Sequence, residues 1–569
     1  MPQLPDKSDV VVIGGVAAGP KTAATLARRR PEMRITLFQK ETHLSYAACG
    51  FPYFASGEVG SFDELLKTSW GSVRDAAYFE NAKGFRAVTR AEVVRINRGT
   101  RTVTVKMLDT GATFEHGYGR LVIATGAAPQ DPPMRVPPAG SDRVRPFTQP
   151  GDVLNFRGLA ERGEVGTAAI IGGGFVGVEL CEAVRDMWGI DVTLFEKQPH
   201  LLPYMLDPDM AELVKRSLAG DGVDVLVGAT VEGIDLDSDG KPVVSVAGHD
   251  PVAADYVFLC LGVRPEVTLA RECGLEIGET GGILVDRYLR TSDPDIFAGG
   301  DCIESRHRLT GHPIYLPMGS LANRHGRVIA ENLAGGDTVF PGVLGAFVLR
   351  AFETNIGGVG LSETAARADG FATRAVWGTF ADRPDYNPET KTMTLKMIYE
   401  DGSDRLLGLQ AVGKGDISRR IDVFSSLLQN EACVGDIFDL EHGYAPPFAE
   451  ALDPLHHMAG IAKALGRGAR FAGPDAYPES IDSGTTILDV RQTEEVESTP
   501  LPADAAERCA EVIAIPLDQL RGRLRELDPA KPYLILCHRG PRSYQAALIL
   551  KAAGFEKVDI LAAGLRAQL

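Results

Sequence analysis

The sequence lacks the features of a membrane or secreted protein. It contains no run of about 18 consecutive apolar residues, the length that a membrane-spanning helix requires. The first seven residues do not resemble a signal peptide, and the apolar run at residues 10–13 is too short to be the hydrophobic core of one. We therefore expect a soluble protein with no membrane partner.

Paired cysteines are also absent. The eight cysteines are scattered and form no Cys-x-x-Cys pair, so neither a zinc site nor a disulfide framework is indicated. We expect no bound metal and a cytoplasmic location, where thiols stay reduced. The formal net charge of -17 argues against nucleic acid as a partner, although a local basic pocket can still bind an anionic substrate.

The composition is that of an ordinary globular protein. The chain has 569 residues, of which 44% are hydrophobic and 24% charged. A chain of this length is expected to form several domains. Strand and helix signals alternate along most of it, which predicts the α/β fold class.

A glycine-rich turn follows the first apolar stretch. Residues 9–13 read as a strand, residues 14–19 contain Gly14 and Gly19, and a helix then runs to Arg30. A second strand is predicted at residues 34–38. This order is the dinucleotide fingerprint, with the pyrophosphate at the helix N-terminus.

The fingerprint departs from the usual pattern at two positions. Val16 replaces the middle glycine, and Gln39 stands where an acidic residue would bind the ribose hydroxyls. Because an amide can still hydrogen-bond a hydroxyl, we expect Gln39 to anchor the cofactor more weakly than an acid would.

Three more apolar strands end in glycine. Residues 121–126 end in Thr125 and Gly126, residues 257–262 end in Gly262, and residues 291–301 end in Gly-Gly-Asp. A turn of small residues lets the backbone approach a cofactor, and Asp301 can accept a hydrogen bond from a ribityl hydroxyl. The alternative for each is a buried strand and a turn, but their joint occurrence in this order favours a nucleotide site.

A second nucleotide unit starts at residue 165. The strand at residues 165–171 leads into a complete Gly-x-Gly-x-x-Gly motif formed by Gly172, Gly174 and Gly177. Glu196 closes the next strand, 24 positions after Gly172. A carboxylate there accepts hydrogen bonds from the ribose and repels a 2′-phosphate, which favours NADH over NADPH. The adjacent Lys197 leaves NADPH open.

Cys49 lies just beyond the first nucleotide unit, in the stretch Ser45–Tyr53. Small neighbouring residues leave its sulfur uncrowded, so the thiol can accept electrons from a flavin held nearby. The alternative is that Cys49 is a small buried hydrophobe, as most free cysteines are.

Together these motifs resemble the two-dinucleotide-binding flavoprotein disulfide reductases, over about residues 8 to 462. Two-cysteine members carry a second thiol five residues further on, where this chain has Phe54. The resemblance is therefore to the single-cysteine branch, which includes coenzyme A disulfide reductase, NADH oxidase and NADH peroxidase. It implies FAD and NADH as cofactors. It also implies that Cys49 pairs with a substrate sulfur or cycles through a sulfenic acid.

Two later stretches, residues 385–388 and 444–448, look like the tyrosine motifs of the coenzyme A disulfide reductase group. The resemblance implies a homodimer in which Tyr386 and Tyr444 reach the reactive cysteine of the other subunit. The alternative is two half-buried aromatic residues at a subunit interface. The resemblance also implies three residues that bind coenzyme A: Lys21, Arg28 and Ser45. The alternative is that their side chains are simply solvated. Where the family often has a lysine, this chain has Leu452.

A separate small α/β unit is predicted at the end of the chain. Strands are expected at residues 486–491, 514–517 and 533–536, and the last leads into Cys537 and a helix at residues 544–553. A loop between a strand end and a helix N-terminus forms an anion nest, and Arg542 adds positive charge, so both favour a thiolate or a persulfide anion on Cys537.

This unit resembles a rhodanese domain, on the Leu-Asp-Val-Arg strand and the Cys537 loop. Protein phosphatases with cysteine nucleophiles carry a similar loop, so phosphate ester chemistry is the alternative. The ranges expected for the whole chain are, in order: an FAD-binding domain at 1–149 and 266–339, an NAD-binding domain at 150–265, an α+β dimerisation domain at 340–465, a linker at 466–474 and a rhodanese domain at 475–569. Within the dimerisation domain, strands are predicted at residues 392–399 and 406–412, and helices at residues 417–428 and 445–464.

The expected function is an NADH-dependent persulfide or polysulfide reductase, or a coenzyme A disulfide reductase, with a fused sulfurtransferase domain. The small-molecule substrate would be a persulfide or disulfide. Two alternatives stay open: an NADH oxidase or peroxidase that cycles a cysteine sulfenic acid, and a redox sensor whose rhodanese domain only docks a partner.

Overall fold

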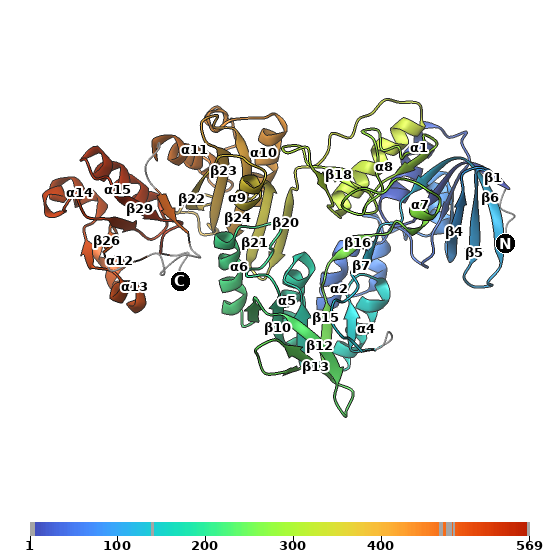
Figure 1. Cartoon of the computed structure of the whole chain (residues 1–569), viewed down its shortest axis with the longest axis horizontal. Helices are drawn as coiled ribbons and strands as arrows, with labels where there is room; N and C mark the ends of the chain where they lie inside the picture. Colours follow the sequence, from blue (N-terminus) through green and yellow to red (C-terminus); the bar gives the residue numbers. More distant parts are fainter. Residues whose placement is uncertain (1–5, 138–140, 466–469, 474–480, 482–483, 566–569) are drawn as a thin grey trace. The chain divides into compact units, whose positions relative to one another are not determined.

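The computed structural model of the protein describes residues 6–137, 141–465, 470–473, 481 and 484–565 (Figure 1). The polypeptide divides into two units, each assembled from segments that are distant in the sequence. The first unit consists of residues 1–172, 182–192 and 231–343, and the second of residues 173–181, 193–230 and 344–569.

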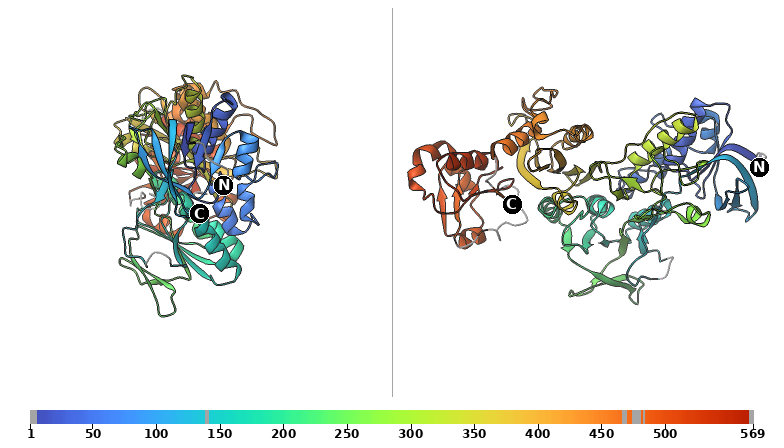
Figure 2. Two further views of the ribbon diagram at one scale, coloured as in Figure 1. Left: turned by 90° about the vertical axis from the view of Figure 1, so that its right-hand side faces the viewer. Right: turned by 45° about the horizontal axis from the view of Figure 1, so that its top comes forward.

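A seven-stranded sheet forms the centre of the first unit. Its strands, in spatial order, are β3 (Arg86–Val88), β2 (Ile35–Phe38), β1 (Lys7–Ile13), β6 (Thr113–Ile123), β5 (Thr102–Met107) and β4 (Ala91–Asn97), and β17 (Ile296–Ala298) also pairs with β6. The strand β1 is parallel to both β2 and β6. Its apolar residues 10–13 are buried, as expected for a parallel strand that is covered on both faces. Helices α1 (Ala18–Arg29) and α8 (Gly319–Leu333) pack against each other beside it (Figure 1, Figure 2).

The segment that follows the second glycine-rich motif contributes parallel strands to both structural units. In the first unit, β15 (Tyr256–Leu259) pairs with β8 (Val144–Pro146) and β9 (Thr167–Ile171). Helix α4 (Pro150–Glu161) packs on β15, where the rings of Phe156 and Phe258 lie 4.8 Å apart. Helix α5 (Phe175–Trp188) follows β9. In the second unit, β10 (Asp191–Glu196) pairs with β11 (Asp224–Val227).

An antiparallel five-stranded sheet organises the next part of the second unit. Its strands, in spatial order, are β20 (Phe347–Ala351), β21 (Thr354–Gly360), β24 (Leu406–Gly413), β23 (Thr392–Glu400) and β22 (Thr373–Ala381). The predicted strands at 392–399 and 406–412 and the predicted helix at 417–428 are confirmed, the helix as α10 (Ser418–Gln429).

The helix predicted at residues 445–464 was wrong over its first half. Helix α11 (Pro454–Leu465) begins nine residues later than predicted. Pro446 and Pro447 explain the difference, because proline lacks the backbone N–H that a helix interior needs. The segment that carries Tyr444 is therefore irregular rather than helical.

The C-terminal part of the second unit is a five-stranded parallel sheet with flanking helices (Figure 2). The strands, in spatial order, are β25 (Arg470–Ala472), β29 (Val558–Leu561), β28 (Tyr533–Leu536), β26 (Thr486–Asp489) and β27 (Glu511–Ala514). The helices are α12 (Thr493–Ser498), α13 (Ala503–Arg508), α14 (Leu517–Arg523) and α15 (Pro541–Ala552).

Two local predictions for this region need correction. The strand predicted at 514–517 is β27, which ends at Ala514, and Leu517 begins α14 because Pro516 caps the helix. Part of the predicted linker is a strand, since Arg470–Ala472 pairs with β29 as β25. Residue 473 of the linker is also described, whereas residues 466–469 and 474 lie outside the described residues.

A search of the described helices finds none with the length and apolarity needed to cross a membrane.

Candidate active sites

The first glycine turn leaves no space for side chains. A Cβ atom at Gly14, whose φ is +109°, would lie 2.0 Å from the carbonyl oxygen of Ala124. A Cβ atom at Gly19 would lie 1.9 Å from the carbonyl oxygen of Gly14. Both positions therefore require glycine, which lets α1 start directly against the ends of β1 and β6.

Gln39 has a role that the sequence did not reveal. Its side chain is buried, and its amide oxygen accepts a hydrogen bond of 2.8 Å from the backbone N–H of Gly15. Gln39 therefore holds the glycine turn against the end of β2. The predicted contact with a ribose stays a prediction.

The residues at the end of β17 fit the ribityl chain of FAD. Burial raises the pKa of Asp301 to about 6, and no residue in the described ranges forms a hydrogen bond or ion pair with its carboxylate. The buried hydroxyl of Tyr315 also has no partner within those ranges. A shielded carboxylate without a donor is suited to a hydroxyl group of a ligand.

The neighbouring glycines leave an open cradle. Gly126 has a φ of +74° and Gly262 a φ of +86°, and a Cβ atom at either position would meet nothing within 4 Å. Thr125, by contrast, is engaged within the protein, because its hydroxyl donates to the carbonyl oxygen of Glu266 at 2.6 Å. Gly126 and Gly262 therefore leave space for a ligand, whereas Thr125 fixes the turn. The predicted binding of FAD by these residues and Asp301 stays a prediction.

The second glycine turn repeats the construction of the first. A Cβ atom at Gly172 would lie 2.3 Å from the carbonyl oxygen of Cys260, whereas one at Gly174 would meet nothing within 4 Å. Gly177 lies in the first turn of α5. The carboxylate of Glu196 accepts hydrogen bonds of 2.7 Å from the backbone N–H groups of Gly173 and Gln198. Glu196 thus supports its turn as Gln39 does, and its oxygens retain lone pairs for a ribose.

Cys49 is exposed, so the alternative of a buried hydrophobe is wrong. It lies in the short helix η1 (Ala48–Gly50), just before α2 (Phe51–Ser56). Its Sγ would be 3.9 Å from a Cβ atom placed on Gly319, the first residue of α8. The sulfur therefore faces the N-terminus of a 15-residue helix, where unpaired N–H groups stabilise an anion.

Helix α2 is held by two residues that sequence reasoning missed. Arg157 donates a hydrogen bond of 2.6 Å to the carbonyl oxygen of Phe54, and the indole N–H of Trp188 donates one of 2.8 Å to that of Ala55. The guanidinium of Arg157 also lies 5.3 Å from the ring centre of Trp188. These bonds satisfy carbonyl groups at the end of α2 and fix the turn that carries the cysteine. Neither residue belongs to a local motif, so no sequence signal identified it.

The three residues predicted to bind coenzyme A lie on or near α1. Lys21 packs on α8, because a Cβ atom at Gly326 would lie 2.9 Å from the Cβ of Lys21. Arg28 is exposed and donates a hydrogen bond of 3.3 Å to the hydroxyl of Thr25. Ser45 has a positive φ of 48°, and its backbone N–H donates to the carbonyl oxygen of Gly15 at 2.8 Å.

Helix α8 adds basic residues that sequence reasoning did not select. Burial, together with the neighbouring charges of Arg308 and Arg327, lowers the pKa of Arg324. Like charges held this close are stabilised when an anion binds between them. The sequence alone does not show that these arginines lie near the predicted coenzyme A residues of α1, because the packing of α1 on α8 is known only from the structure.

The two tyrosine loops meet in the second unit. Tyr386 and Tyr444 are exposed, at 75% and 54% of their maximum area. The side-chain amide of Asn387 donates a hydrogen bond of 3.3 Å to the carbonyl oxygen of Pro446, which joins the two loops. The structure thus brings both predicted tyrosine segments together and leaves both rings exposed in the single chain.

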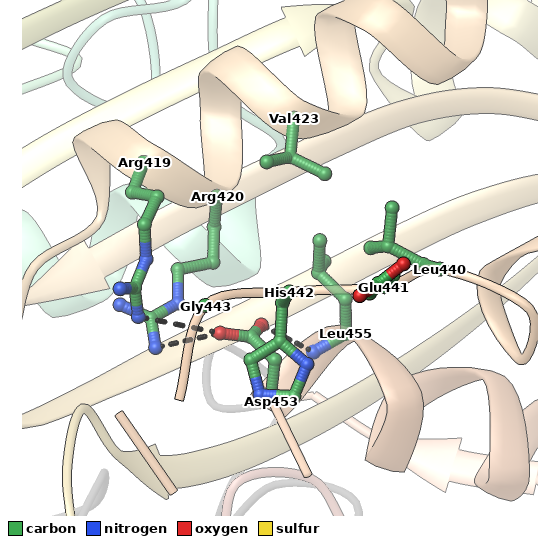
Figure 3. A pocket seen from close by; sticks show the side chains of 9 residues that line it. All are labelled: Arg419, Arg420, Val423, Leu440, Glu441, His442, Gly443, Asp453 and Leu455. Atoms are coloured by element: carbon green, nitrogen blue, oxygen red, sulfur yellow. Dashed lines mark hydrogen bonds and ion pairs between the residues drawn. The ribbon is translucent and has the colours of Figure 1, made fainter. Parts of the chain in front are cut away.

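A cavity of about 200 Å³ lies beside the segment that carries Tyr444 (Figure 3). Arg420 is almost fully buried and forms an ion pair of 2.8 Å with Asp453, toward which Arg419 also points (Figure 3). Arg419 donates a hydrogen bond of 3.2 Å to the carbonyl oxygen of Phe448, and the ring of His442 bonds that of Glu450 at 3.1 Å. These contacts hold the irregular segment in place.

Cys537 is fully buried in the loop between β28 and α15, as predicted. Its Sγ accepts a hydrogen bond of 3.0 Å from the backbone N–H of Gly540, whose φ is +104°. The hydroxyl of Ser543, in the first turn of α15, is fully buried and has no hydrogen-bond partner among the residues that the structure describes. The loop therefore directs one backbone donor at the sulfur, as an anion nest does.

The positive charge predicted at Arg542 is paired with a carboxylate. Its guanidinium forms two hydrogen bonds, of 2.5 and 2.7 Å, with the carboxylate of Glu495 on α12. The bonds to Arg542 hold the pKa of Glu495 at about 2, so this carboxylate is ionised at any physiological pH. Sequence reasoning missed Glu495 because 47 residues separate it from Arg542.

Sequence profiles of known families match three consecutive parts of the chain. Residues 8–315 match the pyridine nucleotide-disulphide oxidoreductase family, and residues 350–456 match the dimerisation domain of the same family. The chain belongs to the pyridine nucleotide-disulphide oxidoreductase family. Residues 474–567 match the rhodanese-like domain, so the resemblances on which the sequence analysis relied are confirmed.

Relatives of this oxidoreductase match either most of the chain or nearly all of it. The NAD(P)H sulfur oxidoreductase (CoA-dependent) of Pyrococcus abyssi is 33% identical over 463 residues, which cover 80% of this chain and 98% of the relative. The structure of a NAD-dependent persulfide reductase from A. fulgidus matches with a TM-score of 0.89 and 36% identity, covering 98% of this chain and 100% of the other. That of Bacillus anthracis CoADR-RHD matches with a TM-score of 0.88 and 29% identity, covering 99% and 97%.

In this oxidoreductase the rhodanese-like domain rests on the sheet of the dimerisation domain. The backbone N–H of Thr379 on β22 donates a hydrogen bond of 3.2 Å to the carbonyl oxygen of Arg539, and its hydroxyl donates one of 3.0 Å to that of Ala563. Arg539 also forms an ion pair of 3.0 Å with Asp385. The loop that carries Cys537 is thus bonded directly to the dimerisation domain, beside the loop that carries Tyr386.

Proposed function

We propose that the protein is an NADH-dependent flavoprotein reductase of persulfides, polysulfides or coenzyme A disulfides, and that its rhodanese domain carries sulfane sulfur. One observation supports this most strongly. An exposed single cysteine faces the N-terminus of α8, and the same chain holds a second cysteine in an anion-binding loop. The relatives named as sulfur oxidoreductase and persulfide reductase support the same reaction class.

The cofactor residues divide between the two glycine turns. Gly14, Gly19 and Asp301, with the open cradle at Gly126 and Gly262, would hold FAD. When bound, FAD accepts a pair of electrons from a nicotinamide and makes them available to a thiol or disulfide. At the second turn, Gly172, Gly174 and Gly177 approach the pyrophosphate of NADH, and the carboxylate of Glu196 binds the ribose hydroxyls and repels the 2′-phosphate of NADPH.

Cys49 performs the sulfur chemistry. Its thiolate attacks the inner sulfur of a persulfide R–S–SH, which breaks the sulfur–sulfur bond, releases hydrosulfide and leaves a mixed disulfide between Cys49 and R. Two electrons, originating from NADH, then reduce this disulfide to the Cys49 thiolate and R–SH. The net reaction converts R–S–SH, NADH and one proton into R–SH, H₂S and NAD⁺. The N-terminus of α8 stabilises the thiolate at both stages.

The active form is proposed to be a homodimer. In the single chain both tyrosine loops are exposed, which is expected if they serve a site completed by a second subunit. The hydroxyl groups of the partner subunit's Tyr386 and the partner subunit's Tyr444 would then stabilise or protonate the leaving sulfur. The dimerisation domain supports this assembly.

Coenzyme A is proposed as the carrier of the substrate sulfur. Lys21, Arg28 and Ser45 would bind it together with Arg324 and Arg327 of α8, because guanidinium and ammonium groups pair with its phosphates. The replacement of a family lysine by Leu452 removes one such contact, so we expect weaker binding than in relatives that keep it.

The test separates the two cysteines. We expect Cys49→Ser to abolish sulfide release from NADH and a persulfide. We expect Cys537→Ser to lose sulfur transfer while NADH still reduces the bound FAD at the normal rate. Matched controls are Cys273→Ser and Cys509→Ser, because each of these thiols donates to a carbonyl oxygen of its own segment and neither belongs to a proposed site.

The competing functions predict different results in the same assays. Sulfide release is measured anaerobically, and peroxide consumption is measured in parallel. Peroxide consumption that exceeds persulfide reduction would identify an NADH peroxidase, and slow turnover with every sulfur substrate would identify a redox sensor. Normal persulfide reduction by the Cys49→Ser variant would refute the proposed mechanism.

A further inference from the structure

Two arginines follow Cys537, Arg539 in its loop and Arg542 in the first turn of α15, and both are paired with carboxylates of other elements. Arg542 forms two hydrogen bonds with Glu495 of α12, at 2.5 and 2.7 Å. Arg539 forms two with Asp385 of the dimerisation domain, at 3.0 and 3.3 Å. Each of these two guanidinium groups is therefore hydrogen-bonded to a carboxylate before a sulfur donor arrives.

A third carboxylate stands near the same place. The pKa of Glu450 is raised by its burial and by the neighbouring charge of Asp385, and the charge of Arg539 acts against this shift. Glu450 is thus close enough to interact with both members of the Asp385–Arg539 pair. Arg420 and Asp453 also act on Glu450, and His538 acts on Glu495. The backbone N–H of Gly540 is directed at the sulfur of Cys537 itself.

From this charge arrangement we propose that Asp385 and Glu495 determine which sulfur donor Cys537 accepts. They disfavour dianions such as thiosulfate and favour persulfides, whose reacting end carries at most one negative charge. The inference rests on the proposed carrier role of Cys537 and adds the donor class. It also assigns a function in donor selection to a residue of the dimerisation domain, Asp385.

The two donors react in the same way but differ in charge. With a persulfide R–S–SH, the Cys537 thiolate attacks the outer sulfur, the donor's sulfur–sulfur bond breaks, a new one forms on Cys537 and R–S⁻ leaves. With thiosulfate the same exchange of bonds releases sulfite, and the loop must admit two negative charges. No oxidant or reductant is consumed in either case.

The experiment measures second-order rate constants for sulfur loading of Cys537 in the oxidised holoenzyme without NADH. Thiosulfate and 2-hydroxyethyl persulfide serve as donors, and peptide mass spectrometry after rapid quenching reports the persulfide on Cys537. For Asp385→Asn and for Glu495→Gln we expect the thiosulfate-to-persulfide ratio of rate constants to rise about tenfold, as expected for removal of one negative charge several ångströms from a dianion. Added salt should reduce this gain.

Two controls separate charge from architecture. Glu526→Gln removes the carboxylate of another glutamate–arginine pair of the same domain, with Arg523 at 2.7 Å, and should leave the ratio at its wild-type value. The double variant Asp385→Asn/Arg539→Gln removes both charges and should return the ratio toward the wild-type value, whereas Arg539→Gln alone should lower it.

The possible results are distinct. An increased ratio in both carboxylate variants, lost in the double variant, supports the inference. A ratio that stays constant while both rate constants fall together would mean that Asp385 only holds the domains together, and the inference would be overturned. If Cys537 takes sulfur from neither donor in the wild-type enzyme, the carrier role itself fails, and donor selection fails with it.

Discussion

A buried lysine offers the sharpest test of the energetics of the second unit. Lys396 lies on β23 with 2% of its side chain exposed, and its ammonium group pairs with Asp207, Asp209 and Glu363 at 3.0, 2.9 and 3.0 Å. Burial acts to raise the pKa of Asp207, but the charge of Lys396 and several hydrogen bonds outweigh it and lower the pKa. Lys396 is therefore paired with three shielded carboxylates, of which Glu363 is also paired with Arg367.

Replacing this lysine should strongly destabilise the second unit. In Lys396→Met the side chain keeps its volume, but the carboxylates of α6 (Pro208–Gly220) and its neighbours lose their cation. Removing one partner of a buried ion pair costs about 3–5 kcal/mol, because the remaining charge stays buried and uncompensated. The matched control is Lys414→Met, since Lys414 pairs with Glu353 at the surface with 53% of its side chain exposed, and such pairs contribute about 0–1 kcal/mol.

The assay is urea unfolding followed by tryptophan fluorescence, to which Trp377 contributes together with Trp70 and Trp188. The ammonium of Lys396 lies 4.8 Å from the centre of the Trp377 ring, and the indole N–H donates to Asp209 at 2.8 Å, so the Trp377 part of the signal reports on the site itself. The contribution of ionised Asp207 to the free energy of unfolding should be fully present above the pKa of this carboxyl in the unfolded chain. It should be lost as the pH falls through the lower pKa of the folded state. The reasoning is refuted if Lys396→Met and Lys414→Met unfold at the same urea concentration, or if the difference between them persists in strong acid.

Three further predictions concern the cofactor sites. Glu196→Gln removes the charge that repels a 2′-phosphate, so the NADH-to-NADPH ratio of kcat/KM should fall about tenfold, and an unchanged ratio would contradict the proposed role. The protein should bind FAD less tightly below about pH 6, where the carboxyl of Asp301 is protonated, and the absorbance of released FAD measures this loss. In Asp301→Asn the release of FAD should not depend on pH in this range. Gly14→Ala should lose FAD because its Cβ would strike Ala124, whereas Gly151→Ala, which has free space, should retain it.

The local elements of this protein could be predicted from its sequence. Each glycine turn lies between an apolar strand and a helix, and the spacing from Gly172 to Glu196 is a property of one contiguous segment. The same holds for the cysteine loops, because the strand before Cys537 and the helix after it are both encoded within a few residues. Such signals depend only on residues that are close in the sequence, so they can be recognised without a structure.

The charges and supports around these elements could be decided only by the tertiary structure. Gln39 was predicted as a ribose ligand, and the structure adds that its amide oxygen accepts a hydrogen bond from Gly15 and so supports the turn. Arg542 was predicted as a fixed positive charge, and only the structure shows Glu495 beside it and brings Asp385 of another domain to Arg539. An ion pair has no periodicity and no preferred sequence separation, so its partner is known only once the chain has folded.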